Sequence, residues 1–273
     1  MGLKSEYGYT HPNVADYARM QKELMLDGKL NPNAFHLPSF ICIGAQKAGT
    51  TWLYVNLKRH PQFRFKSKEV HYFDINRNYS KPLEYYSEHF KYRSRKVITG
   101  DITPSYGVLD EDRIELMHKM MPDAKLIMLM RNPVDRAWSM ATMHFAKNRG
   151  MNMDEIPINT LIDFYKKDKV MERGNYMDII ERFTKYWSRE QLFLGFYEQI
   201  KEDPEGLLQD VLNFLGARKV DLNSLAAKEV INKRTPSYEM PDEIRERLRE
   251  YYRLHIDRMV EEFGEKAECW KWD

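Results

Sequence analysis

At Phe40-Ile-Cys-Ile-Gly-Ala-Gln-Lys-Ala-Gly-Thr-Thr-Trp52 a short apolar run ends in a glycine-bounded loop, and the loop leads directly into a segment with helical character. A strand, such a loop and the start of a helix form a cradle for an anion, because backbone N–H groups and the helix dipole point at one place. Lys47 adds a cation, and Thr50 and Thr51 add hydroxyl groups. The stretch therefore predicts an α/β fold with a phosphate site at the end of its first strand.

The loop is close to a Walker A sequence but departs from it in one position. Gly44 and Gly49 have the G-x-x-x-x-G spacing, yet Thr50 stands where the lysine of a nucleotide triphosphatase belongs. The lysine lies inside the loop, at Lys47. This displacement favours a phosphate-rich donor other than Mg-ATP, with a P-loop small-molecule kinase as the alternative enzyme class.

Composition sets broad limits on the partners and the compartment. The chain has 273 residues and a net charge of +2, so we expect no nucleic-acid partner. Two cysteines make a disulfide framework or a cysteine zinc site improbable, and nothing in the sequence predicts a metal. The sequence shows no apolar run long enough to cross a bilayer and no secretion signal. We expect a cytoplasmic protein with no transmembrane segment, and the sequence leaves its oligomeric state open.

The order of predicted elements indicates a single α/β domain over residues 38–273. Residues 1–37 form an extension with a helix over 14–26, which either packs on the domain, acts as a lid or contacts a partner. Predicted strands cover 39–43, 63–65, 97–99, 124–130 and 191–197, and predicted helices cover 50–59, 82–90, 112–120, 133–147, 176–187, 204–215 and 242–263. Alternating strands and helices indicate a central parallel sheet with helices on both faces.

A second motif follows the strongest predicted strand, at Arg131-Asn-Pro-Val-Asp-Arg-Ala-Trp-Ser139. Asn132 suits a helix N-cap and Pro133 the first helical position. Ser139 shares a helix face with Arg136. Because ligands of parallel sheets bind beyond the carboxyl ends of the strands, we expect Arg131 and the glycine loop to converge on one ligand. A guanidinium and a hydroxyl can bind a second phosphate there; the alternative is an ordinary ion pair at a helix start.

These two motifs resemble those of a known family. The loop resembles the 5′-phosphosulfate loop of sulfotransferases that use 3′-phosphoadenosine 5′-phosphosulfate (PAPS), and Arg131 to Ser139 resembles their 3′-phosphate motif. The likeness is greatest to the heparan-sulfate-type branch and its bacterial relatives, and it extends over about 39–262 through 173–176, 196–198 and 232–234. It implies a P-loop-kinase-like sulfotransferase fold, with PAPS as cofactor and adenosine 3′,5′-bisphosphate (PAP) as product. The implied cofactor-binding residues are Gln46, Lys47, Ala48, Gly49, Thr50, Thr51, Trp52, Arg131, Ser139, Lys233 and Arg234.

Some of these assignments keep two readings. Trp52 either packs under the loop helix or lies near the adenine. The pair Lys233 and Arg234 either closes on the 3′-phosphate or is an ordinary solvated pair. Lys47 also has an implied catalytic role, because it would neutralise charge on the leaving phosphate.

A third motif, Lys68-Glu-Val-His-Tyr-Phe-Asp74, is similar to the catalytic segment of that branch, in which the glutamate serves as the base. In an extended backbone Glu69 and His71 project to the same side. A carboxylate beside an imidazole can accept a hydroxyl proton, and Asp74 could orient His71. The alternatives are a polar strand in which the spacing is due to chance, or a salt bridge between Lys68 and Glu69.

The segment Asp101-Ile-Thr-Pro-Ser-Tyr106 resembles the part of the family where heparan-type members carry a lysine after the acidic residue. This chain has Ile102 there, which removes a cation from the acceptor side and favours a less anionic acceptor. We expect Asp74, Thr103 and Tyr106 to line the acceptor side.

The leading hypothesis is a sulfotransferase that moves a sulfuryl group from PAPS by in-line displacement, with Glu69 as the base. The acceptor is a hydroxyl or an amine of a small-molecule, carrier-bound, lipid or sugar substrate. The alternatives are the P-loop kinase and a non-catalytic nucleotide-binding module that holds a partner through residues 1–37.

Overall fold

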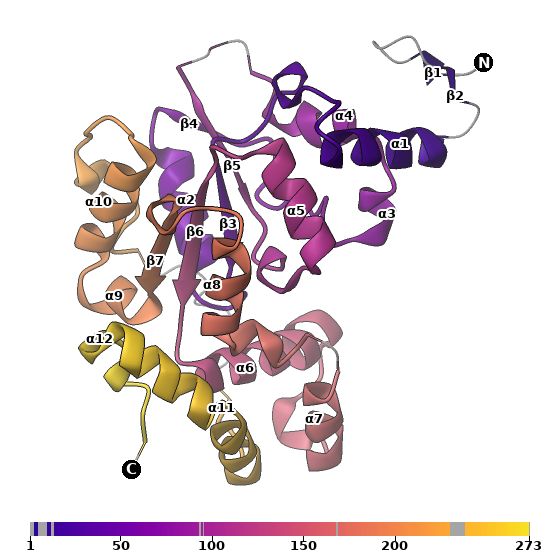
Figure 1. Ribbon diagram of the computed structural model, residues 1–273. Coiled ribbons are helices and arrows are strands. Elements are labelled where there is room, and N and C mark those ends of the chain that lie inside the picture. The colour runs from indigo at the N-terminus through magenta and orange to yellow at the C-terminus, as the bar shows by residue number, and fades with distance from the viewer. Residues whose placement is uncertain are drawn as a thin grey trace.

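The computed structural model describes residues 3–4, 10–11, 14–92, 94, 96–167, 169–229 and 238–272. Its centre is a five-stranded sheet in which every neighbouring pair is parallel, in the order β4-β5-β3-β6-β7 (Figure 1). The strands are β3 (Phe40–Gly44), β4 (Phe63–Arg64), β5 (Ile98–Ile102), β6 (Lys125–Met130) and β7 (Leu192–Phe196). All five residues of β3 are buried, which explains its unbroken apolar sequence.

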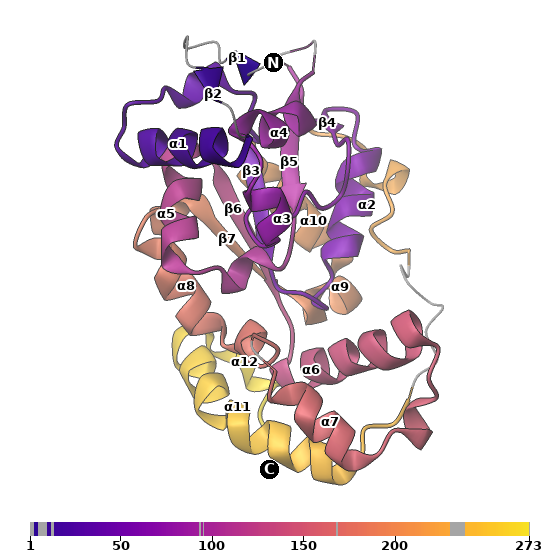
Figure 2. The same cartoon turned by 90° about the vertical axis from the view of Figure 1, so that its right-hand side faces the viewer.

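Helices cover both faces of the sheet, as Figure 2 shows. On one side lie α2 (Thr50–Arg59) and α10 (Pro204–Leu215), and on the other lie α5 (Glu111–Met120) and α8 (Tyr176–Thr184). The predicted fold class, a parallel sheet between two helical layers, is therefore confirmed. Strand β3, the first of this sheet along the chain, is its central strand. The glycine loop that follows β3 therefore lies at the middle of the edge formed by the carboxyl ends of the strands.

A third group of helices lies beyond the carboxyl ends of β6 and β7 (Figure 1). It consists of α6 (Pro133–Thr142), α7 (Ile158–Tyr165) and α11 (Asp242–Phe263), and α11 packs against α6, α7 and α8. The shorter helices are α3 (Asn76–Tyr79), α4 (Leu83–Ser87), α9 (Tyr197–Glu202) and α12 (Glu265–Glu268). Of the helices that the structure describes, none is both long and apolar enough to cross a membrane.

The N-terminal part contributes a two-stranded antiparallel sheet, β1 (Leu3–Lys4) with β2 (Thr10–His11), and helix α1 (Val14–Leu26). Helix α1 packs against α5 and α4. Gln21 is buried and its amide donates to both carboxylate oxygens of Glu84 at 2.8 and 3.0 Å. These contacts fasten α1 to the rest of the chain, and the domain boundary at residue 38 stays a prediction.

The observed elements differ from the predicted ones mainly at their ends. The strand predicted over 97–99 continues to Ile102, because pairing with β3 overrides the weak strand propensity of Gly100 and Asp101. The helix predicted over 133–147 becomes a π-helix over Met143–Lys147. The helix predicted over 82–90 divides into α4 and a 3₁₀ turn at Glu88–Phe90.

Candidate active site

The glycine loop joins β3 to α2 at the centre of the sheet. Gly49 is the N-cap of α2 and has φ of 97°, a left-handed conformation that favours glycine. A Cβ atom at Gly49 would also lie 2.4 Å from the terminal methyl group of Ile200, which would have to move, so the backbone conformation is the main reason for glycine here. Lys47, inside the loop, is left-handed as well, with φ of 73°. The carbonyl oxygen of Gln46's side chain is buried and has no hydrogen-bond partner among the described residues.

Lys47 lies where several cations converge. Burial, and then the like charges of Lys147, Arg131 and Lys68, lower the pKa of its ammonium group to about 8. A bound anion would relieve both effects, because it offers the ammonium groups a partner and offsets their mutual repulsion. The charges around the loop therefore fit a phosphate or sulfate group.

The second motif lies at the next strand end. Arg131 directly follows β6, and its guanidinium Nη1 donates to the Lys47 carbonyl oxygen at 3.4 Å. The guanidinium also lies 4.7 Å above the ring of Tyr197, a cation–π contact that orients it. Asn132 caps α6 as predicted: its side chain accepts from the amide of Val134. Arg131 and the loop are thus adjacent, as the strand ends predict.

The other residues predicted to bind the nucleotide differ in exposure. Thr51 on α2 and Ser139 on α6 are partly exposed, whereas Ala48 and Thr50 are buried. Lys233 and Arg234 lie outside the described residues. The indole of Trp52 is 4% exposed and donates to the Ala227 carbonyl at 2.8 Å. This burial agrees with packing against the core, and a position near the adenine stays a prediction.

Arg136 precedes Ser139 by three residues on α6, as predicted, but it is buried whereas Ser139 is partly exposed. It has no exposed surface, and its guanidinium donates to the Val170 carbonyl at 2.9 Å and to the Tyr252 hydroxyl at 3.2 Å. Arg136 connects α6 to α11 and leaves Arg131 as the guanidinium near the loop.

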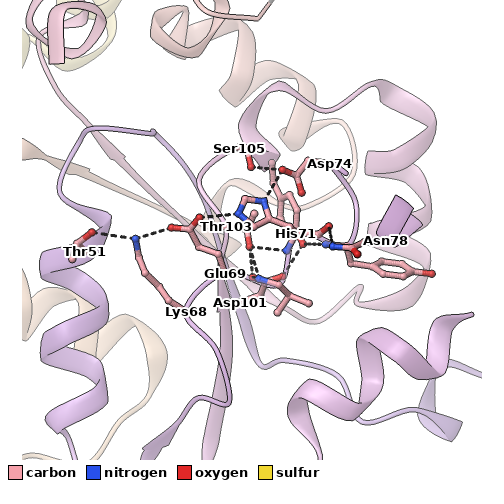
Figure 3. Close-up of polar contacts among 12 residues, drawn as sticks. Thr51, Lys68, Glu69, His71, Asp74, Asn78, Asp101, Thr103 and Ser105 are labelled. Carbon is pink, nitrogen blue, oxygen red and sulfur yellow. Dashed lines mark hydrogen bonds and ion pairs between the residues drawn. The ribbon is translucent and has the colours of Figure 1, made fainter. Parts of the chain in front are cut away.

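The third motif forms a continuous polar chain beside the loop (Figure 3). The Glu69 carboxylate accepts from Lys68 Nζ at 2.8 Å and pairs with His71 Nε2 at 2.9 Å. His71 Nδ1 pairs with Asp74 Oδ2 at 2.8 Å, and that oxygen also accepts from the Ser105 hydroxyl at 2.6 Å. The predicted proximity of Glu69, His71 and Asp74 is present, together with the Lys68–Glu69 salt bridge that was its alternative.

The chain of contacts fixes the charges of its members. Asp74 and then Glu69 raise the pKa of His71 to about 10, so the imidazole is a cation at neutral pH. Burial works to raise the pKa of Glu69, but the hydrogen bonds from His71 and Lys68 outweigh it and hold the pKa below its ordinary value. Glu69 is therefore an ionised carboxylate, which is the form that accepts a proton.

A buried carboxylate, that of Asp101, supports the segment 68–74 through neighbouring hydroxyl groups. It accepts from the hydroxyls of Thr103 at 2.6 Å, Tyr106 at 2.9 Å and Tyr86 at 3.2 Å. Two of these hydroxyls in turn accept backbone amides of the segment 68–74: Val70 N donates to Thr103 and Tyr72 N donates to Tyr106, both at 3.0 Å. Burial raises the pKa of Asp101 to about 6, against the hydrogen bonds from Thr103 and Tyr106.

The expectation that Thr103 and Tyr106 line the acceptor side is corrected. Both have no exposed surface, so they hold the segment 68–74 and do not line a substrate surface. Ile102 is also fully buried, within β5, because strand alternation and pairing with β3 place it in the core. Asp74 remains partly exposed beside His71.

Sequence reasoning missed the positions of Lys68 and Tyr197. Lys68 was considered only as an ion-pair partner, yet its ammonium also donates to the Thr51 hydroxyl at 3.1 Å and so connects the third motif to α2. The signal for Tyr197 was present in the Phe196-Tyr-Glu198 likeness, but nothing in the sequence indicated that the ring would lie under Arg131. No His, Cys, Asp and Glu cluster suited to a metal occurs in the described ranges.

The parallel sheet and its glycine loop define an α/β protein with a phosphate-binding cradle at the central strand. The sequence matches the family model of the sulfotransferase domain over residues 37–233. The chain therefore belongs to the sulfotransferase domain family.

Curated relatives come from the heparan sulfate enzymes. Heparan sulfate glucosamine 3-O-sulfotransferase 3B1 of Mus musculus is 32% identical over 194 residues, covering 67% of this chain and 47% of the relative. Heparan sulfate glucosamine 3-O-sulfotransferase 5 of Homo sapiens is 30% identical over 185 residues, covering 66% and 53%. The chain spans about half the length of these relatives.

Solved structures show the same fold. A sulfotransferase from Alicyclobacillus acidocaldarius superposes with a TM-score of 0.65 at 23% identity, covering 86% of this chain and 98% of that one. A mouse sulfotransferase complexed with PAP superposes with a TM-score of 0.54 at 18% identity, covering 92% and 94%.

Proposed function

We propose that this chain transfers a sulfuryl group from PAPS to a hydroxyl of a sugar or other small-molecule acceptor. The observation that carries the proposal is the placement of an ionised Glu69, held by His71, directly beside a phosphate cradle rich in cations. The cations of the cradle match the anionic donor, and the Glu69 carboxylate can accept the proton of the acceptor hydroxyl. The relatives named for 3-O-sulfotransfer to glucosamine support a hydroxyl acceptor over an amine.

The residues around the loop fit the proposed donor. PAPS, when bound, supplies an activated sulfuryl group and leaves as PAP. The loop from Gln46 to Trp52 would hold the 5′ end through its backbone amides, and Thr51 through its hydroxyl. Arg131 and Ser139 would hold the 3′-phosphate. Lys47, whose ammonium lacks an anionic partner among the described residues, would neutralise the charge on the leaving phosphate.

Glu69 would remove the proton from the acceptor hydroxyl. Its carboxylate is ionised, partly exposed and oriented by the His71 imidazolium, so it is both charged and fixed in direction. His71 is held from its other side by Asp74, which keeps it protonated and limits it to orienting Glu69 and stabilising its charge. Positioning and cationic donors then supply most of the rate, as in phosphoryl transfer.

We keep a less anionic acceptor as part of the proposal, because the family likeness puts Ile102 where heparan-type members would carry a lysine. The Ile102 side chain itself is buried in β5, so it does not contact the acceptor. Carrier-bound and lipid acceptors belong to the same proposal. Cys42 and Cys269 are both free thiols, which is compatible with the proposed cytoplasmic location.

The first experiment tests the donor. Calorimetry with PAP, and separately with ATP and Mg²⁺, distinguishes the two enzyme classes that share this loop. We expect binding of PAP and not of Mg-ATP, because Thr50 replaces the lysine of a Walker A loop. Binding of Mg-ATP without PAP would establish the kinase alternative.

The second experiment tests the base. Transfer of radiolabelled sulfate from PAPS to a panel of sugar, phenol, alcohol and amine acceptors is measured for the wild type, Glu69→Gln and the exposed control Glu88→Gln. We expect Glu69→Gln to lower kcat about 100-fold or more, with PAP affinity unchanged, because the amide cannot take the proton. Near-wild-type turnover in that variant would remove Glu69 from its role. PAP binding by the wild type without transfer to any acceptor would favour a non-catalytic module.

A further inference from the structure

Lys68 has a position that the proposed function does not use. Its ammonium group donates to the Thr51 hydroxyl at 3.1 Å and to Glu69 Oε1 at 2.8 Å (Figure 3). Thr51 belongs to the first turn of α2, next to the proposed donor cradle, and Glu69 is the proposed base. Its side chain is 24% exposed, so one part of it is still open to a ligand.

The two contacts of Lys68 mark the ends of the reaction path. In an in-line transfer the sulfuryl group travels from the phosphate on the cradle to the oxygen beside the base. A cation that touches both the cradle helix and the base therefore lies next to that path. The charge of Lys68 is also among those that lower the pKa of Lys47, the residue proposed to bind the 5′ end of the donor.

Resting on the proposed function, we propose that Lys68 is a catalytic residue that binds the transferring sulfuryl group and thereby releases Glu69 to act as base. In the free enzyme both oxygens of Glu69 are occupied, Oε1 by Lys68 and Oε2 by His71. When the donor is present, the Lys68 ammonium donates to a sulfuryl oxygen, and Oε1 becomes free. The imidazolium of His71 keeps the carboxylate in place.

The step balances without a further reactant. The acceptor O–H proton moves to Glu69 Oε1 as the acceptor oxygen forms a bond to sulfur. The bond between sulfur and the bridging oxygen breaks, and its electron pair stays with the leaving phosphate. Lys68 remains protonated throughout and stabilises the negative charge spread over the sulfuryl oxygens.

The test compares two nucleotides that differ only by the sulfuryl group. Affinities for PAP and for PAPS, without acceptor, are measured by calorimetry in the wild type, Lys68→Met, Lys68→Arg and the control Lys66→Met. Lys66 lies two residues upstream, is exposed and contacts the Glu88 carbonyl instead of the site. Thermal unfolding of each variant establishes that it is folded.

We expect Lys68→Met to weaken PAPS binding about tenfold and to leave PAP binding within about twofold of the wild type, because a hydrogen bond to a charged group contributes at that level. Transfer should fall about 100-fold in kcat, Lys68→Arg should recover most of both losses, and Lys66→Met should match the wild type.

Equal losses for PAP and PAPS would make Lys68 a structural support of the loop and overturn the inference, as would unchanged PAPS affinity. A wild type that binds neither nucleotide would overturn the proposed function itself. The comparison within one protein therefore separates the two failures.

Discussion

At the scale of single residues, His71 decides the charge state of the site. Its imidazole lies between two carboxylates, 2.8 Å from Asp74 and 2.9 Å from Glu69, and φ at His71 is 55°. A non-glycine residue in this left-handed region is uncommon and costs on the order of 1 kcal/mol. The two ion pairs offset that cost, so the strained backbone and the charge of His71 depend on each other.

This coupling predicts a pH-dependent stability. The pKa of His71 is raised to about 10 in the folded state, so its stabilisation is complete below the unfolded value near 6.5 and is lost as the pH rises through about 10. Urea unfolding of the wild type and His71→Gln at pH 6.5 and pH 9.5 should show a stability difference that shrinks by about 1 to 2 kcal/mol, after allowance for partial exposure. A difference that stays constant would mean that His71 is neutral in the folded protein.

The residue scale also shows where sequence reasoning succeeded and where it stopped. Glu69, His71 and Asp74 meet as predicted, but the reason given for it, an extended backbone, is not the one that the structure has. At His71 the chain turns into the left-handed region, and a contact of its amide with Thr103 accompanies that turn. The bridge from Lys68 to Thr51 was not predictable, because alternation along an extended backbone places Lys68 and Glu69 on opposite sides.

At the scale of elements, strand β5 and the turn after it hold the segment 68–74, which carries the proposed base. The Asp101 carboxylate accepts hydrogen bonds from the hydroxyls of Thr103 and Tyr106. These hydroxyls in turn accept hydrogen bonds from the backbone amides of Val70 and Tyr72, on either side of His71. The sequence placed both hydroxyls on the acceptor side. Their burial could not be predicted because it depends on how the segment folds over the end of β5.

Matched variants test this support. Tyr106→Phe removes a donor to Asp101 and the acceptor of Tyr72 N, whereas Tyr86→Phe removes a donor to Asp101 but no contact to the segment. Each should lower the free energy of unfolding by about 1 to 2 kcal/mol. Only Tyr106→Phe should also lower kcat for sulfate transfer, by about tenfold, with PAP affinity unchanged. Equal kcat values for the two variants would mean that the hydrogen bond between Tyr72 N and Tyr106 is not needed for transfer.

At the scale of the whole molecule, the sheet order explains why distant motifs meet. The central β3 has β5 on one side and β6 on the other, so the loop, residues 101–106 and Arg131 all emerge at one edge. The buried apolar strands were predictable because the runs are short and are bounded by glycine, proline or polar residues. The role of Arg136 was not, because helix spacing cannot tell which face of α6 another helix covers.

The last prediction separates the two arginines of that motif. Arg136 is buried and joins α6 to Val170 and to Tyr252 of α11, so Arg136→Lys should lower the free energy of unfolding by about 2 to 3 kcal/mol, because one ammonium cannot replace a planar fork. PAP affinity should stay within about threefold. Arg131→Lys should do the reverse, with PAP affinity lowered about tenfold and stability nearly unchanged. Urea unfolding measures the stability of each variant, and calorimetry measures its affinity for PAP. A loss of PAP affinity in an Arg136→Lys protein of unchanged stability would show that Arg136 takes part in nucleotide binding.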